Sequence, residues 1–377
     1  MNAGLLQGRG RWLAFTVATL ALIGCLLLGW GAPRQALLSY LFAFLFFTGL
    51  SVGSLALAMV HALTGGAWGF CLRPYLLAAA RTLPLQAMMA LPLLIGVRVL
   101  YPWASPELLA HDAVLRAQSW YLEPYFFIGR TIVYFAVWLA LLAAFERRIE
   151  NPGFLPRIAA PGLIVYALTA TLAAVDWVMS LLPHWHSTVF GMTIATGWML
   201  AAAALATLCA MGAATSKDAQ LPPRLSHDLG NLLLMFVLVW SYLAFMQYLT
   251  VWIADLPAET SWYIPRTLTT WRLLAWFLIA FHFAVPFTVL LSRRAKRRRT
   301  WLAWIAALLL IANLVDALWL VVPDEHPQGL VLHWTDLFAP LGLGALWLCV
   351  FIGRAPARRV RASASLSTPH PAGHAHG

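Results

Sequence analysis

Charged residues are scarce in this chain of 377 residues. They make up 10% of the sequence, whereas a soluble domain carries about 25%. Hydrophobic residues reach 62%, and the mean hydropathy is +0.77. A soluble protein this apolar could not cover its surface with polar groups. The composition therefore excludes a soluble domain and a disordered chain. It predicts a polytopic membrane protein, with room for about ten helical spans.

Cysteine is also scarce. The four cysteines lie far apart and form no CxxC pair, which excludes a disulfide scaffold and an iron–sulfur site and favours small packing residues. The chain has no glycine-rich phosphate loop, no HExxH motif and no nucleophile–base constellation. Self-contained hydrolase or transferase chemistry therefore has no support. The cysteines are Cys25, Cys71, Cys209 and Cys349.

Long apolar runs dominate what is present, and they predict an all-α integral membrane domain over 1–354. The first run is not expected to be a cleaved signal peptide, because no small-residue cleavage site precedes Arg34. We expect ten spans at residues 12–30, 36–64, 75–97, 124–145, 158–182, 187–212, 229–253, 266–292, 301–322 and 334–353.

Basic residues lie between these spans, so the net charge of +11 does not indicate nucleic-acid binding. Their excess in alternate loops predicts that both termini are cytoplasmic. The densest run, Arg293–Arg299, either anchors this topology or binds anionic lipid headgroups or a partner. The tail, 355–377, is rich in Ala, Ser and Pro and is predicted to be disordered.

Two polar positions recur along the chain at a similar spacing. Arg266 follows Arg130 by 136 residues, and Asp316 follows Asp176 by 140 residues. Each pair is four spans apart, which predicts two parallel four-helix repeats over 36–182 and 187–322, with the first and last spans at the periphery.

These ionisable residues are costly in a bilayer and are expected to pair or to serve a function. Their depths predict a cluster of Arg130 with Asp176, and another of Arg266 or Arg272 with Asp316. Two interpretations remain open for each cluster. One is a structural pair that fixes helix rotation, and the other is a proton-handling site beside a quinone headgroup.

Three further polar residues lie within spans: His61, Arg81 and His282. Axial haem ligation is not expected, because the two histidines lie at different depths and neither has a companion histidine on a neighbouring span. Membership of a proton relay remains open beside ordinary hydrogen bonding between helices.

Two predicted outer loops carry further candidates. His184 and His186 lie in the turn between the fifth and sixth spans, where they either pass protons or belong to an interfacial turn. No third ligand adjoins them, so a zinc site is not expected. After the seventh span, Asp255 and Glu259 are candidates for proton acceptors or for contacts with a partner.

These two loops carry a resemblance to a known family. The first stretch, residues 176–191, resembles a signature D-W-x-M-S-L-x-P-H-W-x-S-T-x-F-G. The second stretch, residues 240–263, is similar to W-S-Y-L-x-F-x-Q-Y-L-x-x-W followed by L-P-A-E-T and W-Y. Both are typical of the ActF-type membrane subunit of bacterial alternative complex III, a relative of NrfD and polysulfide-reductase membrane subunits. The matching residues include Asp176, Trp177, Ser180, Pro183, His184, Trp185, Ser187, Phe190, Gln247, Tyr248, Trp252 and Glu259.

The resemblance implies a subunit of a quinol:electron-acceptor oxidoreductase in the bacterial inner membrane. It implies no cofactor in this chain except possible contact with a quinone. It places haems and iron–sulfur clusters in partners: an ActC-like membrane subunit, an iron–sulfur subunit and a multihaem cytochrome. Proton conduction, a quinone site and scaffolding are the implied roles. A stand-alone secondary transporter and an inert scaffold are the alternatives.

Overall fold

A computed structural model describes residues 3–151, 153–213 and 221–355, and it confirms the all-α fold. Ten helical segments of the described chain are long and apolar enough to cross a membrane. The predicted tail, after Ala355, lies outside the described residues. The spans are Gly10–Gly29, Pro33–Thr64, Ala67–Ile95, Pro124–Arg147, Leu155–Leu181, Phe190–Ala213, Pro223–Ala254, Arg272–Leu291, Arg299–Asp324 and Thr335–Arg354.

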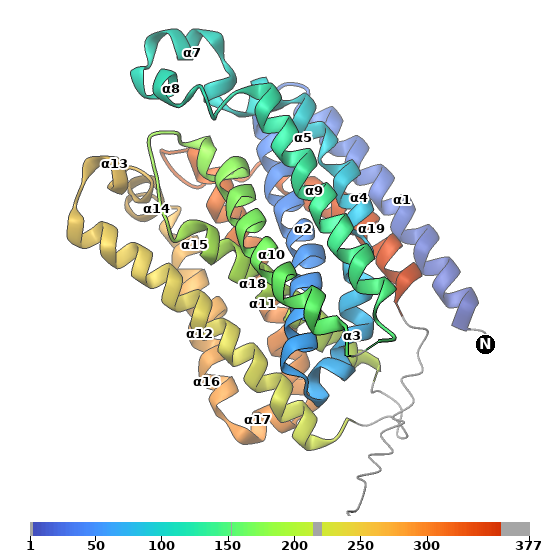
Figure 1. The fold of residues 1–377 in the computed structure, drawn as a ribbon. Coiled ribbons are helices and arrows are strands. Elements are labelled where there is room, and N and C mark those ends of the chain that lie inside the picture. The colour runs from blue at the N-terminus through green and yellow to red at the C-terminus, as the bar shows by residue number, and fades with distance from the viewer. Residues whose placement is uncertain (1–2, 152, 214–220, 356–377) are drawn as a thin grey trace, which may run out of the picture.

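Several spans consist of more than one helical element (Figure 1). The elements used below are α1 (Ala3–Gly29), α2 (Pro33–Thr64), α3 (Ala67–Ala80), α4 (Leu83–Met89), α7 (Pro106–His111), α8 (Ala113–Gln118), α9 (Pro124–Arg147), α10 (Leu155–Trp177), α11 (Phe190–Ala213), α12 (Pro223–Ala254), α13 (Pro257–Thr260), α14 (Tyr263–Leu268), α15 (Arg272–Phe277), the π-helix η4 (Leu278–Ala284), α16 (Val285–Leu291), α17 (Arg293–Arg297), α18 (Arg299–Val321), η5 (Val322–Asp324) and α19 (Thr335–Arg354).

Helix α2 lies at the centre of the bundle, where 94% of its most apolar stretch is buried. It packs against α3, α10, α11, α18 and α19. A helix that is hydrophobic all round is expected in such a position. Its small residues allow close packing: a Cβ on Gly53 would lie 2.3 Å from the carbonyl oxygen of Trp198 in α11.

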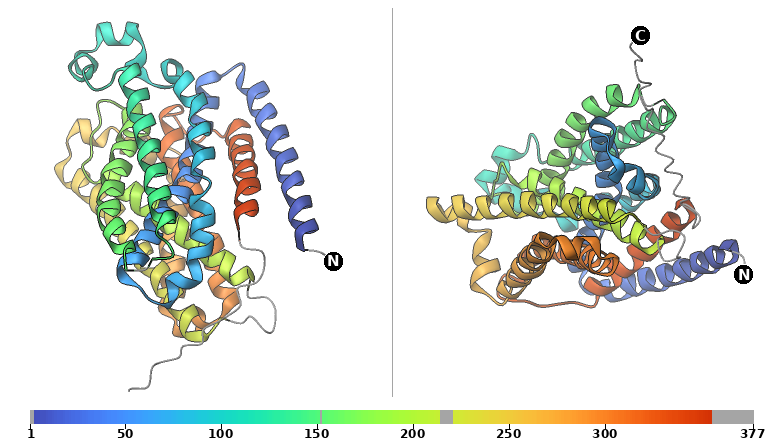
Figure 2. Two further views of the ribbon diagram at one scale, coloured as in Figure 1. Left: turned by 45° about the vertical axis from the view of Figure 1, so that its right-hand side comes forward. Right: turned by 90° about the horizontal axis from the view of Figure 1, so that it is seen from below.

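Helices α1 and α19 pack together at one edge of the molecule, as Figure 2 shows from two directions. Only 28% of the apolar stretch of α1 is buried, which agrees with a peripheral first span. The division into two four-helix repeats stays a prediction. Helices α2 and α3 of the first unit pack directly on α11 of the second, so the units share their packing surfaces.

The two ends of the bundle differ in chemistry. We call the end that holds α7, α8 and α13 the distal face, and the end that holds α17 the basic face (Figure 1). The basic face carries the run Arg293–Arg299 and the described ends of α1 and α19. The prediction that the basic face is cytoplasmic rests on this charge.

Three predicted span boundaries were wrong by six residues or more. The seventh span begins at Pro223 rather than 229, because the helix already starts at this proline, ahead of its apolar part. The third span begins at Ala67 rather than 75, because its inner part continues through Pro74. The eighth begins at Arg272 rather than 266, because the backbone of Thr269 is extended and separates α14 from α15. Arg266 therefore lies in a short helix outside the span, and this changes its partner.

The eighth span also changes its winding in the middle, at η4. Pro286 follows four residues after His282 and has no N–H to donate to the His282 carbonyl. A missing bond of this kind is a recognised cause of a local distortion in a helix, and π segments occur frequently at functional sites.

Candidate functional site

Arg130 and Asp176 form the predicted pair near the distal face. Arg130 donates from Nε to Asp176 Oδ2 at 2.8 Å and from Nη2 to Oδ1 at 3.0 Å. The Tyr134 hydroxyl donates to Oδ2 at 2.6 Å, and Arg130 Nη1 donates to the Tyr121 carbonyl at 2.8 Å. Asp176 is fully buried. A bidentate pair with these further bonds satisfies both charges, which favours the structural interpretation.

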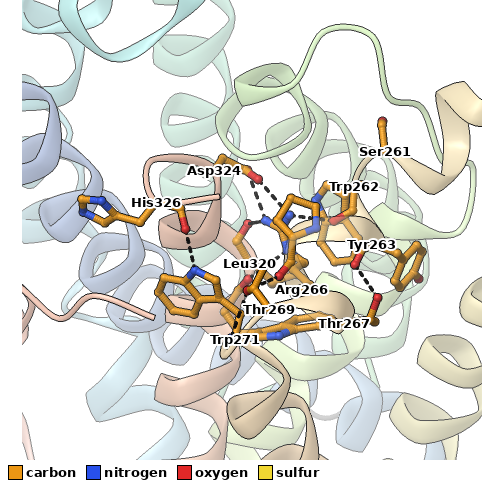
Figure 3. A network of polar contacts seen from close by, with 12 residues as sticks. Ser261, Trp262, Tyr263, Arg266, Thr267, Thr269, Trp271, Leu320, Asp324 and His326 are labelled. Atoms are coloured by element: carbon orange, nitrogen blue, oxygen red, sulfur yellow. Dashed lines mark hydrogen bonds and ion pairs between the residues drawn. The ribbon is translucent and has the colours of Figure 1, made fainter. Parts of the chain in front are cut away.

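Arg266 does not pair with Asp316, which corrects one of the two predicted options. Figure 3 shows its guanidinium between Trp262, Leu320 and Asp324. Arg266 donates to both carboxylate oxygens of Asp324, at 2.8 and 3.1 Å, and the remaining N–H groups reach the carbonyls of Trp262, Trp319 and Leu320. All five N–H donors are used, so this fully buried arginine joins α14 to the end of α18.

The physical reason for this correction is depth. Asp316 lies eight residues before Asp324, which is about 12 Å deeper along a helix. Because α14 lies outside the span, Arg266 meets the end of α18 and not its middle. Arg272, the other predicted option, starts α15 and is exposed, with no ion pair to Asp316 among the described residues.

A cavity of about 930 Å³ lies between α11, α12, α14, the eighth span and α18. Its walls are mostly aromatic and aliphatic, and its polar groups come from every side. Exposed aromatic residues of α12 and α15 form part of its lining, so it reaches the surface between these two helices. The lining includes Phe190, Ile194, Trp240, Tyr242, Ala244, Phe245, Gln247, Tyr248, Trp262, Tyr263, Arg272, Trp276, Phe283, Asp316 and Trp319.

The hydrogen-bonding groups of this cavity lie at two levels. Near the distal face, the hydroxyl of Tyr263 contacts the side chain of Gln247, and Tyr248 and Arg272 lie beside them. Burial is the main cause that raises the pKa of Tyr263, so this phenol stays a neutral donor. At the deeper level lies Asp316, which has no ion pair among the described residues.

Asp316 also borders a second, much smaller cavity of about 30 Å³, which Gly197 and Asn313 help to line. This volume exceeds the 10–15 Å³ that one water molecule needs. Asp316 thus lies between a large cavity and a space that fits a water. The indole of Trp240 faces its carboxylate but has no partner at full hydrogen-bond distance.

His282, in the π-helix η4, is hydrogen-bonded to Asn313. Asn313 donates from Nδ2 to His282 Nε2 at 3.1 Å and to the Leu309 carbonyl at 2.9 Å. His282 Nε2 is then an acceptor, so Nδ1 carries the proton of a neutral ring, and this atom has no hydrogen-bond partner. The ring of Trp240 lies 3.8 Å from the His282 ring. His282 is therefore buried against Asn313 and Trp240, and Asn313 lines the small cavity together with Asp316.

His61 and Arg81 lie elsewhere and do not line this cavity. His61 contacts the Gly66 carbonyl from Nε2 at 3.1 Å and packs on Trp68. Arg81 pairs with Glu146 near the end of α9 on the side of the basic face. The first contact is a local bond at the end of α2, and the second joins the break between α3 and α4 to the end of α9.

His184 and His186 occupy the distal loops and bond to the segment that holds α7 and α8. His184 Nε2 lies 3.0 Å from Asp112 Oδ2, and Gln118 Nε2 lies 3.2 Å from His186 Nε2. Burial raises the pKa of Asp112, but the backbone N–H groups of Leu115 and Val114 and the His184 ring together hold it below its ordinary value. These contacts support an interfacial turn.

The two motif stretches meet in space. Trp185 stacks on Trp262 with ring centroids 4.9 Å apart, and both are buried. Trp177 donates to the Thr131 hydroxyl, and Ser180 donates to the Asp176 carbonyl oxygen. Much of the first motif is therefore structural. Gln247, Tyr248 and Phe190 line the cavity, whereas Pro183, Ser187, Trp252 and Glu259 do not.

The roles of Asp324 and Asn313 and the presence of the π-helix were not predicted from the sequence. Each is nevertheless marked by a feature of the sequence. Asp324 follows Pro323 at the end of the ninth span, Asn313 lies one turn before Asp316 on the same helix face, and Pro286 interrupts the eighth span after His282.

Comparison with family models and with curated proteins finds no match to this chain.

Proposed function

We propose that this chain is an integral-membrane subunit of a respiratory quinol:electron-acceptor oxidoreductase of the alternative complex III type, and that its large cavity accepts a quinone headgroup. The observation that carries the proposal is the position of Gln247 and Tyr248, two motif residues, on the wall of a cavity that ends at Asp316. Concave, mostly apolar sites with a few convergent polar groups are typical of cofactor and small-molecule binding.

The lining suits a quinone in two respects. Its aromatic walls stack on a planar ring, and the Gln247 amide, the Tyr248 hydroxyl and the Arg272 guanidinium donate to carbonyl oxygens. The mouth lies between α12 and α15, where Tyr242, Phe245 and Trp276 are 61%, 57% and 64% exposed. An opening toward the lipid lets an isoprenoid tail remain in the membrane.

Asp316 gives the site a group for handling protons. Oxidation of a quinol releases protons together with electrons, and an unpaired carboxylate near the headgroup is a suitable acceptor. Asn313 and the small cavity beside Asp316 then supply a polar environment for a water. The Arg266–Asp324 pair stabilises the distal end of the site by joining α14 to the end of the ninth span, whereas the Arg130–Asp176 pair joins α9 to α10, which do not line the cavity.

Electrons must pass to another protein in this proposal. We assign haems and iron–sulfur clusters to partner subunits: an ActC-like membrane subunit, an iron–sulfur subunit and a multihaem cytochrome. The exposed distal loops with His184, Asp255 and Glu259 are the surface that meets such partners, and the bacterial inner membrane is the expected location.

Gentle detergent extraction of the tagged protein tests membership of the complex. Mass spectrometry and a haem absorbance spectrum of the co-purifying material are the readouts. We expect a multihaem cytochrome, an iron–sulfur protein and a second ten-span subunit. A chain that is stable, colourless and alone would contradict the proposal and would favour the secondary transporter.

The scaffold alternative is tested separately, by filling the cavity. In the purified complex, Ala244→Trp places a large ring on the cavity wall, whereas Ala254→Trp places the same ring at the exposed end of α12. We expect quinol turnover to fall only with the first. Equal turnover in both variants would mean that the chain acts as a scaffold.

A further inference from the structure

A second pocket, of about 360 Å³, opens at the basic face where α12, α16 and α17 meet. It lies nearer the basic-face ends of α12 and of the eighth span than the large cavity does, and it shares no lining residue with that cavity. Every ionisable group on its wall is a base. The lining residues are His227, Asn231, Leu291, Arg293, Lys296 and Arg297.

Lys296 is the buried member of this group. It is only 6% exposed, although it belongs to a run of exposed arginines. Its Nζ donates to Asn231 Oδ1 at 2.5 Å. Burial, and then the charge of Arg293, lower the pKa of Lys296. A buried ammonium is normally paired with an acid, so this lysine lacks the usual compensation.

Carboxylates do not supply that compensation within the described part of the chain. No described Asp or Glu lies within ion-pair distance of Arg293, Lys296 or Arg297. Asp228 approaches His227 at 3.7 Å, but it does not line the pocket. The pocket therefore offers many donors around one space and no anion of its own.

The backbone of α12 is shaped to admit the lysine. A Cβ on Gly230 would lie 2.7 Å from Lys296 Cγ and 3.1 Å from its Cβ, so the aliphatic stem lies in a slot that only glycine leaves open. The inward position of Lys296 is thus fixed by packing and is not one of many positions of a free surface lysine.

The place of the pocket suggests the source of the anion. It lies where the spans Pro223–Ala254 and Arg272–Leu291 end, at the level of lipid headgroups. Leu291, on its wall, is 56% exposed at the end of a membrane span, where an acyl chain would run. Basic pockets between transmembrane helices are a known type of site for acidic headgroups.

We propose that this pocket binds a phosphate group, carried by an anionic phospholipid, between Lys296 and the guanidinium groups of Arg293 and Arg297. The phosphate oxygens accept from the three cationic side chains, and the lipid tail lies against Leu291. The site ties the α16–α17 corner to α12 and to the membrane surface.

Binding of a labelled phosphatidylglycerol to the full-length protein, purified with the partners it carries, tests this site. Three variants are compared with the wild type. Lys296→Gln removes the buried charge and keeps most of the stem. Arg298→Gln removes an exposed charge of the same run outside the pocket, as a matched control. Gly230→Ala keeps every charge but closes the slot, and alanine favours a helix more than glycine does, so α12 is expected to form.

We expect Lys296→Gln and Gly230→Ala to weaken binding on the order of tenfold, the effect of losing one charge-assisted hydrogen bond, and Arg298→Gln to weaken it about twofold or less. Equal binding by Lys296→Gln and Arg298→Gln would overturn the site, because bulk charge would then explain the affinity. Release of the lipid by millimolar inorganic phosphate, with phosphate bound in its place, would overturn the lipid assignment and identify free phosphate as the ligand.

Discussion

At the scale of single residues, the molecule contains charges of two kinds. Arg130, Asp176, Arg266 and Asp324 are fully paired, whereas Asp316 is half-buried at the cavity and has no ion pair among the described residues. Sequence spacing predicted the first pair because both residues lie in regular spans. It failed for Arg266 because the break at Thr269, which no simple pattern marks, moves that arginine out of the eighth span.

Removing one member of a paired set is expected to destabilise the fold. Asp176→Asn leaves the guanidinium of Arg130 without its carboxylate, and breaking a buried pair costs about 3–5 kcal/mol. Asp255→Asn is the control, since Asp255 is exposed and its left-handed backbone tolerates Asn. Thermal unfolding in detergent, followed by tryptophan fluorescence, measures both. If Asp176→Asn melted like the control, the pair would not hold the distal end together.

Substitutions of Arg266 and Arg272 are expected to change different properties, the first the stability of the fold and the second the affinity for quinone. Arg266→Gln loses the bonds that join α14 to α18, so the melting temperature falls. Arg272→Gln removes an exposed donor at the cavity wall, so stability is kept and quinone affinity falls about tenfold. Melting curves and quinone titrations of both variants check this. The reverse pattern would place Arg266 in the binding site.

Asp316→Asn is expected to keep the fold, because the amide leaves no buried charge unpaired and fits the same space. Quinol turnover is expected to fall at least tenfold, since the amide cannot accept a proton. Turnover of the purified complex, measured beside its melting temperature, decides this. Full activity at unchanged stability would remove Asp316 from the proton path.

At the scale of helical elements, the sequence predicted the number and order of spans, because each apolar run is long and bounded by basic or aromatic loops. The sequence did not predict where the spans depart from regular α-helical geometry. Span three is interrupted near Arg81, and span eight contains the π-helix η4, which sets the rotation of His282. Depth follows from counting residues along a helix, but rotation depends on such local defects.

Pro286→Ala tests the role of η4. The alanine N–H restores a donor for the His282 carbonyl, so the segment is expected to relax toward an α-helix and to turn His282 away from Asn313. Stability is expected to stay or rise, while quinol turnover falls. Pro340→Ala, in α19 and away from the cavity, is the control. Unchanged turnover in Pro286→Ala would show that the π segment is only an accommodation of proline.

At the scale of the whole molecule, polar chemistry is divided between the two faces and the interior. The distal face holds the paired arginines and the histidine loops, the interior holds Asp316 and His282, and the basic face holds Lys296. Composition predicted the basic face directly. The cavity could not be predicted, because it arises where α12 and the eighth span diverge, and no pattern within either helix records their separation.

In the proposed function, a quinone enters the cavity between α12 and α15. A photoreactive quinone analogue, cross-linked to the complex in membranes and located by peptide mass spectrometry, tests it most directly. We expect labels on α12 around Phe245 and on α15 around Trp276, and we expect Ala244→Trp to abolish them while Ala254→Trp keeps them. Labelling that is unchanged by Ala244→Trp, or confined to other subunits, would show that the quinone does not bind in this cavity.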